Sequence, residues 1–217
     1  DKIIKMSEES SNEELIVIMT LGYCSVGKSS FILRFTENKF ENTYLTTVGI
    51  DSKFRLLNIQ DIQYKVLFYD TAGQERFHSI APNIIKKANG IIIMYDITNK
   101  QSFDSIPEIL KAIENEKGEN FPLILIGNKI DLENERIIKK EEGEELAEKY
   151  GMEFIEVSNK EGINIEKAGL SIINKILEKR KDDSNIETNE SSRSSKTSYH
   201  SKYSNIDNDG INRSNCS

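Results

Sequence analysis

The chain has 217 residues, of which 37% are hydrophobic and 30% charged, and its formal net charge at pH 7 is −7. This length suits one domain of about 150–180 residues with tails. The acidic balance disfavours nonspecific binding to nucleic acid, and the lack of any apolar run of about 18 residues argues against a transmembrane helix. Its two cysteines, Cys24 and Cys216, lie far apart in the sequence, which fits a reducing compartment.

Composition divides the chain into three parts. Residues 1–12 are polar and are expected to form a flexible N-terminal segment. From residue 13 to about residue 180, apolar strand-like runs alternate with amphipathic helix-like stretches, which predicts an α/β domain with a largely parallel sheet. After residue 181, serine and asparagine dominate and large apolar residues become rare, so residues 181–217 are expected to be a disordered tail.

The apolar run 15–21 predicts a strand, and it leads into Gly22-Tyr23-Cys24-Ser25-Val26-Gly27-Lys28-Ser29, which has the phosphate-loop spacing G-x-x-x-x-G-K-[ST]. Glycines allow the backbone to bend tightly around a phosphate chain. The loop amides and the N-terminus of the next helix, expected to end near residue 37, form an anion site. Lys28 is expected to reach the β- and γ-phosphates, and the Ser29 hydroxyl to bind Mg²⁺.

A loop is expected at 38–48, followed by strands at 51–59 and 62–69 that are joined by a hairpin at Gln60-Asp61. The second strand runs into Asp70-Thr71-Ala72-Gly73-Gln74, at a strand end where α/β folds place ligands. Asp70 is placed to hold Mg²⁺ through water, and Gly73 to bring its backbone N–H to the γ-phosphate. Gln74 is too weak a base to take a proton, but its amide can orient an attacking water.

Continuous apolar runs at 90–95 and 123–126 predict central parallel strands that are covered on both faces. Helical spacing predicts a helix over 103–113, a charged helix over 138–150 and a packing helix over 163–180. Gly151 fits a C-terminal cap for the charged helix. The alternation at 153–157 is typical of an edge strand.

The strand predicted from the apolar run at 123–126 is directly followed by the tetrad Asn128-Lys129-Ile130-Asp131. A carboxylate can accept hydrogen bonds from both N–H donors on the guanine edge, and adenine offers no equivalent pair. A site built in this way discriminates strongly, because the wrong base leaves buried polar groups unpaired. The tetrad therefore favours recognition of guanine.

Together with Thr47–Asp51, Gln74-Glu75-Arg76-Phe77, Tyr95–Thr98 and Ser158-Asn159-Lys160, these motifs make residues 13–180 resemble a small GTPase of the Ras superfamily, specifically of the Rab family. The resemblance implies a P-loop fold with a six-stranded, mostly parallel mixed sheet and about five helices. It also implies a GTP/GDP switch with Mg²⁺, mobile loops near 41–51 and 70–83, slow GTP hydrolysis and a role in vesicle traffic.

The resemblance also assigns roles to individual residues. Ser29 and Thr47 bind Mg²⁺, Thr47 only with GTP; Asn128 and Asp131 read the base, Lys129 stacks on it, and Ser158 supports Asp131. Phe40 packs edgewise on the guanine, although core packing explains it equally well. The implied nucleotide contacts are Ser25, Val26, Gly27, Lys28, Ser29, Ser30, Phe40, Thr47, Gly73, Asn128, Lys129, Asp131, Ser158, Asn159 and Lys160; the metal residues are Ser29, Thr47 and Asp70, and the catalytic ones Gln74 and Lys28.

The chain departs from the family pattern in several places. Cys24 replaces the usual Gly or Ser, and Ser25 a position that is mostly Gly; these side chains lie near the γ-phosphate, so we expect them to slow turnover. Asn159 replaces an Ala that serves mainly through its backbone N–H. Three exposed aromatic anchors for Rab effectors are also changed, so common effectors are expected to bind poorly; the substituted positions are Ser52, Tyr69 and Ile84.

Cys216 has the placement of a geranylgeranylated Rab cysteine, although it is not part of a C-a-a-X box. One lipid gives only marginal anchoring, so we expect a cytoplasmic protein that attaches reversibly to an endomembrane; an unmodified cysteine is the alternative. The implied partners are an exchange factor, a GTPase-activating protein, a GDP-dissociation inhibitor or escort, and membrane effectors. The protein is expected to be monomeric and to bind no nucleic acid.

Two other functions remain open. The first is a nucleotide-loaded binding module with negligible catalysis, which Cys24 and Ser25 motivate. The second is a Ras- or Rho-type signalling GTPase, against which the Gln-Glu-Arg-Phe run and the missing C-a-a-X end both argue.

Overall fold

The computed structural model describes residues 13–41, 50–71 and 85–200. Contacts between residues divide the chain into a first unit, 1–176, and a second unit, 177–217. The first unit contains the sheet and the helices that cover it.

The sheet has six strands in the order β2-β3-β1-β4-β5-β6. Every neighbouring pair is parallel except β2 with β3, which is antiparallel. The predicted hairpin is confirmed, because Gln60 and Asp61 have the positive φ angles (51° and 64°) of a tight two-residue turn. The strands are β1 (Glu13–Leu21), β2 (Ile50–Ile59), β3 (Ile62–Thr71), β4 (Gly90–Asp96), β5 (Leu123–Asn128) and β6 (Glu153–Val157).

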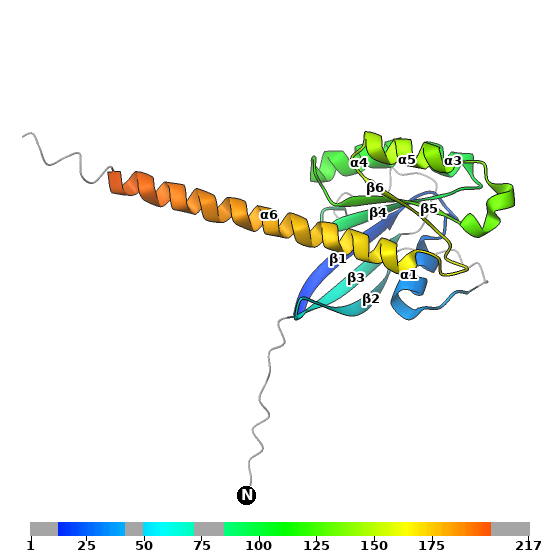
Figure 1. Cartoon of the computed structure of the whole chain (residues 1–217), viewed down its shortest axis with the longest axis horizontal. Helices are drawn as coiled ribbons and strands as arrows, with labels where there is room; N and C mark the ends of the chain where they lie inside the picture. The colour runs from blue at the N-terminus through cyan, green and yellow to red at the C-terminus, as the bar shows by residue number, and fades with distance from the viewer. Residues whose placement is uncertain (1–12, 42–49, 72–84, 201–217) are drawn as a thin grey trace, which may run out of the picture. The chain divides into compact units, whose positions relative to one another are not determined.

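Helices cover both faces of this sheet, with α4 and α5 on one side and α1 and the beginning of α6 on the other (Figure 1). The helix predicted at 103–113 is divided at Ser105, which ends one helix and is the N-cap of the next. A short 3₁₀ helix that begins at Ile130, within the tetrad 128–131, was not predicted. The helices of the described residues are α1 (Lys28–Glu37), α3 (Lys100–Asp104), α4 (Ile106–Lys117), η2 (Ile130–Glu135), α5 (Lys140–Lys149) and α6 (Ile165–His200).

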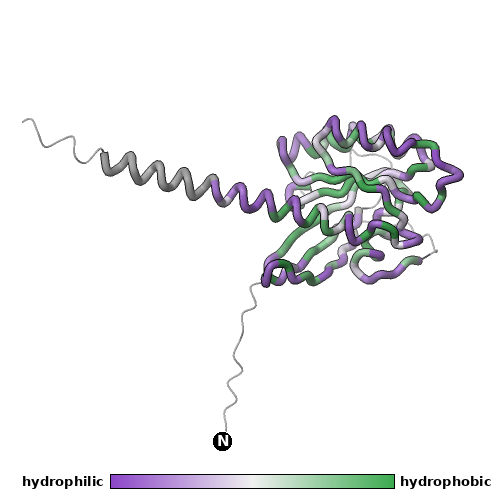
Figure 2. Tube along the Cα trace, in the orientation of Figure 1, coloured by the Kyte–Doolittle hydropathy of each residue, from purple (hydrophilic) through white to green (hydrophobic). Residues whose placement is uncertain are grey.

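The core lies between the central strands and the helices, and all of β4 is buried. Hydrophobic residues, coloured green, are concentrated along these strands (Figure 2). On one face, alternate residues of β1 and β4 such as Met19 and Ile93 pack with Ile109 of α4. On the other face α6 approaches closely at Gly90, where a Cβ would lie 2.7 Å from Ile176 Cδ1. The predicted six-stranded P-loop architecture is thereby confirmed.

The structure differs from the sequence prediction beyond residue 181, because α6 continues to His200. Residues 181–185 are exposed, so burial does not hold this stretch in helical form. A helix satisfies its own backbone groups, and i,i+4 contacts such as Lys179–Asp183 (3.1 Å) add local support; composition alone overlooks both. Residues 201–217, with Cys216, lie outside the described residues. No helix in the described part of the chain is both long and apolar enough to span a bilayer.

Candidate nucleotide-binding site

The phosphate loop connects the end of β1 to the beginning of α1. Gly22 and Gly27 have φ angles of 149° and 99°, a region that favours glycine. A Cβ on Gly22 would overlap the Met94 carbonyl, and one on Gly27 would overlap the amide of Asn128. Ser25 also has a positive φ of 62°, which gives a backbone reason for the glycine usual at its position. The loop therefore packs too tightly for side chains at its two glycines.

Lys28 folds back into this loop. Its Nζ donates to the carbonyl oxygens of Gly22 (2.9 Å) and Tyr23 (2.8 Å), and the residue is buried. Burial lowers the pKa of Lys28 to about 8, and the nearby Asp70 carboxylate and Cys24 act in the opposite direction. An ammonium group has three N–H donors, so a further bond to a phosphate oxygen is compatible with these two. Such an anion would favour the charged form.

Asp70 is positioned by the pairing of β3 with β1, in which it stands opposite Thr20 just before the phosphate loop. It is buried. The Ser29 hydroxyl and the Asp70 carboxylate supply oxygen donors, which suit Mg²⁺. No group of three metal-binding His, Cys, Asp or Glu side chains occurs among the described residues, so water and phosphate would have to complete the coordination of an ion there. The predicted residues Thr47, Gly73, Gln74 and Ile84 lie outside the described residues.

The base tetrad and the 158–160 loop meet because β5 and β6 are parallel neighbours. Ser158 Oγ donates to Asp131 Oδ1 (2.6 Å), which fixes the carboxylate. Lys129 Nζ forms an ion pair with Asp96 Oδ2 at the end of β4 (2.5 Å), which anchors the tip of the side chain. Asn128 Nδ2 donates to the carbonyl of Val26 (2.7 Å). The structure therefore brings the base tetrad into direct contact with the phosphate loop.

Arg34 of α1 holds the 158–160 loop from another side, and the sequence did not single it out. Its guanidinium donates to the carbonyl oxygens of Asn159 (2.9 Å) and Lys160 (2.6 Å). The same group lies 5.7 Å from the centre of the Phe40 ring. Phe40 is only half-buried and is not part of the buried core, so its alternative role in core packing is not supported.

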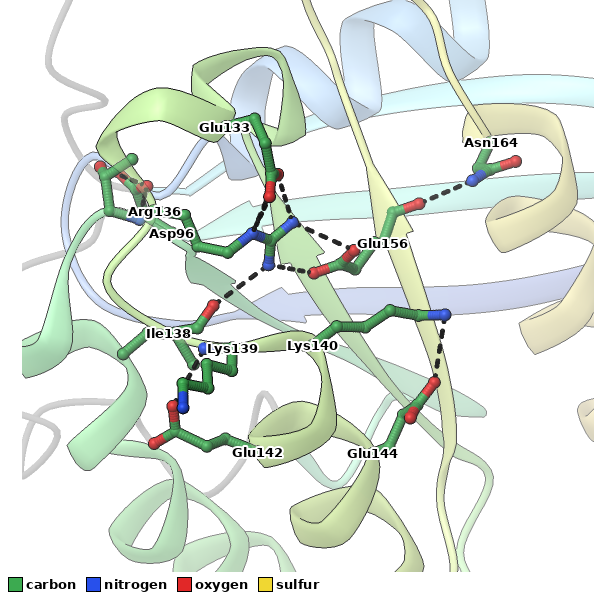
Figure 3. A network of polar contacts seen from close by, with 11 residues as sticks. Asp96, Glu133, Arg136, Ile138, Lys139, Lys140, Glu142, Glu144, Glu156 and Asn164 are labelled. Carbon is green, nitrogen blue, oxygen red and sulfur yellow. Dashed lines mark hydrogen bonds and ion pairs between the residues drawn. The ribbon is translucent and has the colours of Figure 1, made fainter.

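Arg136 supports the base tetrad from the end of η2 and was also missed (Figure 3). Its guanidinium bonds to Glu133 on η2 (2.8 Å) and to Glu156 on β6 (2.6 Å), and it donates to the Ile138 carbonyl (3.1 Å). Its hydrogen bonds hold the pKa of Glu133 below the ordinary value. Glu156 lies on β6, which leads directly to Ser158. The network therefore joins the segment after Asp131 to the strand before Ser158, the residue that donates to the Asp131 carboxylate.

Comparisons with known proteins agree with this geometry. The model of the Ras family matches residues 16–178. The chain is 39% identical to Ras-related protein Rab-10 of Diplobatis ommata over 165 residues, covering 76% of this chain and 82% of that protein. It is 37% identical to GTP-binding protein ypt2 of Schizosaccharomyces pombe (83% and 90% covered) and to human Ras-related protein Rab-3A (81% and 80% covered).

Proposed function

Because this chain belongs to the Ras family and is a Rab-like small GTPase that binds GTP or GDP with Mg²⁺, we propose that residues 22–29, Asp70, 128–131 and 158–160 form its nucleotide site. As a Rab-like protein it hydrolyses GTP to GDP and regulates vesicle traffic. The hydrogen bond from Asn128 Nδ2 to the Val26 carbonyl carries the proposal. It joins base-reading and phosphate-binding residues that are 102 positions apart in the sequence.

Each side chain of the proposed site has a definite task. Lys28 and the backbone amides of the loop hold the phosphates, while the Asp131 carboxylate, oriented by Ser158, accepts from the two N–H groups of guanine. Lys129 lays its aliphatic stem along the base with its ammonium held by Asp96. Mg²⁺, when bound, neutralises charge that develops on the phosphates, and Ser29 and Asp70 are the described residues that would hold it. Gln74, with Thr47 and Gly73 beside the γ-phosphate, would orient the attacking water.

We extend the proposal to the remaining parts of the chain. Residues 13–180 form the GTP-binding domain, and Cys216 carries a prenyl group that attaches the protein reversibly to the cytoplasmic face of an endomembrane. Family membership implies exchange factors, activating proteins, GDP-dissociation inhibitors and effectors in general. Ser52 and Tyr69 stand opposite each other on β2 and β3. Ser52 stands where Phe is usual in Rab proteins, and Tyr69 stands where Trp is usual. We therefore propose that the effectors of this protein are not the common ones.

The test is a single turnover of the full chain loaded with γ-labelled GTP and Mg²⁺. We expect slow phosphate release that falls further in Gln74→Leu, since that variant cannot orient the water. Release no faster than spontaneous hydrolysis, from fully loaded protein, would favour the binding-module alternative. In that case Cys24→Gly and Ser25→Gly are the variants that should restore turnover, and glycine also suits the positive φ of Ser25 (62°).

A further inference from the structure

Asn159 makes a side-chain contact that the role of its backbone does not explain. The residue is 3% exposed, and its Nδ2 donates to the carbonyl oxygen of Gly27 over 2.9 Å. The same carbonyl accepts the backbone N–H of Phe31 (2.9 Å), as the N-cap carbonyl of α1. The amide of Asn159 therefore holds the N-terminus of the helix that follows the phosphate loop, the end that favours anions.

Two neighbouring carbonyls of the phosphate loop are held in this way. Asn128 binds the carbonyl of Val26 (2.7 Å), and Asn159 binds the carbonyl of Gly27 (2.9 Å). The two residues also contact each other, since the Asn159 backbone N–H donates to Oδ1 of the Asn128 side chain (3.3 Å). A Cβ on Gly27 would lie only 2.7 Å from Asn159 Nδ2. The absent side chain of Gly27 is thus what allows the second link.

The oxygen of the Asn159 side-chain amide indicates that folding stability alone does not account for this residue. Its Oδ1 is buried and has no hydrogen-bond partner within the part of the chain that the structure describes. Reversing the amide would not help, because Oδ1 would then face the Gly27 carbonyl, which is also an acceptor. Burying an unpaired acceptor destabilises a fold. The bond from Nδ2 to the phosphate loop is the contact that distinguishes this side chain.

We propose that Asn159 is a positioning residue that couples the base-binding loop to the phosphate loop and thereby slows the release of bound guanine nucleotide. The inference rests on the proposed nucleotide site. With the link in place, the two loops cannot separate independently, so a nucleotide that bridges them is released less often. The net worth of one neutral hydrogen bond corresponds to a roughly 2- to 10-fold change in rate.

Asn159→Ala tests the link cleanly, because Arg34 still holds the backbone of the loop through the carbonyls of residues 159 and 160. The full chain is loaded with a fluorescent GDP analogue and Mg²⁺, and its release is followed after adding excess GDP. We expect release roughly 2- to 10-fold faster in Asn159→Ala than in the wild type. Asn164→Ala is the matched control, since Asn164 Nδ2 donates to the Glu156 carbonyl (2.8 Å) from an exposed site; its release rate should not change.

A second readout separates coupling from a general loosening of the protein. Competition against the same analogue gives the relative affinities for GDP and GMP. GMP lacks the β-phosphate that the loop cradles, so Asn159→Ala should weaken GDP binding more than GMP binding. The ratio of the two affinities should therefore fall in Asn159→Ala and stay constant in Asn164→Ala.

Thermal unfolding of the same samples completes the experiment. A lower melting temperature in Asn159→Ala with an unchanged rate of release would show a purely structural role and would overturn the inference. Equal acceleration in Asn159→Ala and Asn164→Ala would overturn it as well. A wild-type chain that binds no GDP at all would overturn the proposed function itself, and the inference with it.

Discussion

At the scale of single residues, the base selectivity that we propose depends on one carboxylate held in one orientation. Asp131 receives the Ser158 hydroxyl at 2.6 Å on Oδ1. That hydroxyl also accepts the backbone N–H of Glu161 (3.0 Å), so its proton is directed at Asp131. A carboxylate positioned in this way offers only acceptors to the base, which matches the two donors of guanine.

Asp131→Asn should therefore change the base preference of the protein. An amide presents one acceptor and one donor, which fits the N1–H and C2 carbonyl of xanthine but not the two donors of guanine. We expect GDP affinity to fall at least about 10²-fold and affinity for xanthosine diphosphate to rise, as measured by competition against a fluorescent nucleotide. Unchanged GDP affinity would show that Asp131 does not read the base.

At the scale of elements, Gly143 allows α5 to pack closely against the sheet. A Cβ on Gly143 would lie 2.5 Å from both the Tyr95 hydroxyl oxygen and the Phe154 ring. Tyr95 is fully buried, and burial raises the pKa of its hydroxyl above the ordinary value. The helix thus approaches β4 and β6 more closely than a larger residue would permit.

Gly143→Ala should destabilise the protein, although alanine is the better helix former. Overpacking costs about 1–3 kcal/mol, whereas the helix preference of alanine returns at most about 1 kcal/mol. We expect a net loss of about 1 kcal/mol in the free energy of unfolding by urea, with GDP present. The exposed Glu145→Ala on the same helix is the control and should change it by less than about 0.5 kcal/mol. A gain in Gly143→Ala would contradict the close packing.

The end of α1 is joined to β2 by a titratable contact. Glu37 binds Lys53 at 2.7 Å and Lys39 at 2.9 Å, and the hydrogen bond from Lys53 is the main reason why the pKa of Glu37 falls to about 2. The folded-state pKa is below the ordinary value of 4.5, so between about pH 2 and pH 4.5 the unfolded state binds more protons than the folded state. The stabilisation is present above pH 4.5 and is lost as the pH falls toward 2.

Glu37→Gln should therefore lower the melting temperature at pH 7, and the difference from the wild type should shrink at pH 3.5. The effect should be small because these groups are exposed and solvent screens them. Adding 1 M salt at pH 7 should reduce the difference in the same way. A difference that is independent of both pH and salt would mean that the ion pairs contribute nothing.

At the scale of the whole molecule, α6 belongs to two units. Its first turns contribute Ile172, Ile173 and Ile176 to the core, and the division between the units falls after Ile176. Residues 181–185 are exposed. The folded domain therefore draws stability from the beginning of this helix and none from the side chains at 181–185.

A chain that ends at residue 185 should keep the stability and the GDP release rate of the full chain. We expect the melting temperature to change by less than about 2 °C, because residues 181–185, which precede the cut, are already exposed. A chain that ends at residue 171 should fail to fold, since it loses three buried isoleucines worth about 1.5–3 kcal/mol each. A large loss of stability in the chain that ends at residue 185 would show that the end of α6 supports the domain.

Short-range patterns in the sequence determined most of the fold and pointed to the residues of the proposed site. The spacing of Gly22, Gly27 and Lys28 indicates a phosphate loop because the backbone of such a loop tolerates few other residues. Continuous apolar runs indicated β4 and β5 because strands covered on both faces need apolar side chains throughout. These signals are local, so one sequence is enough to read them.

Only the tertiary structure could show how distant segments support the site. The contacts from Arg34 and Asn159 join positions 125 and 132 residues apart, and no spacing rule relates them. Which carbonyl an amide reaches depends on how parallel strands bring their ends together. The helix after residue 181 was also missed. The composition of this segment indicates only that it has too few apolar residues to form a core, whereas a helix can pair its own backbone groups without one.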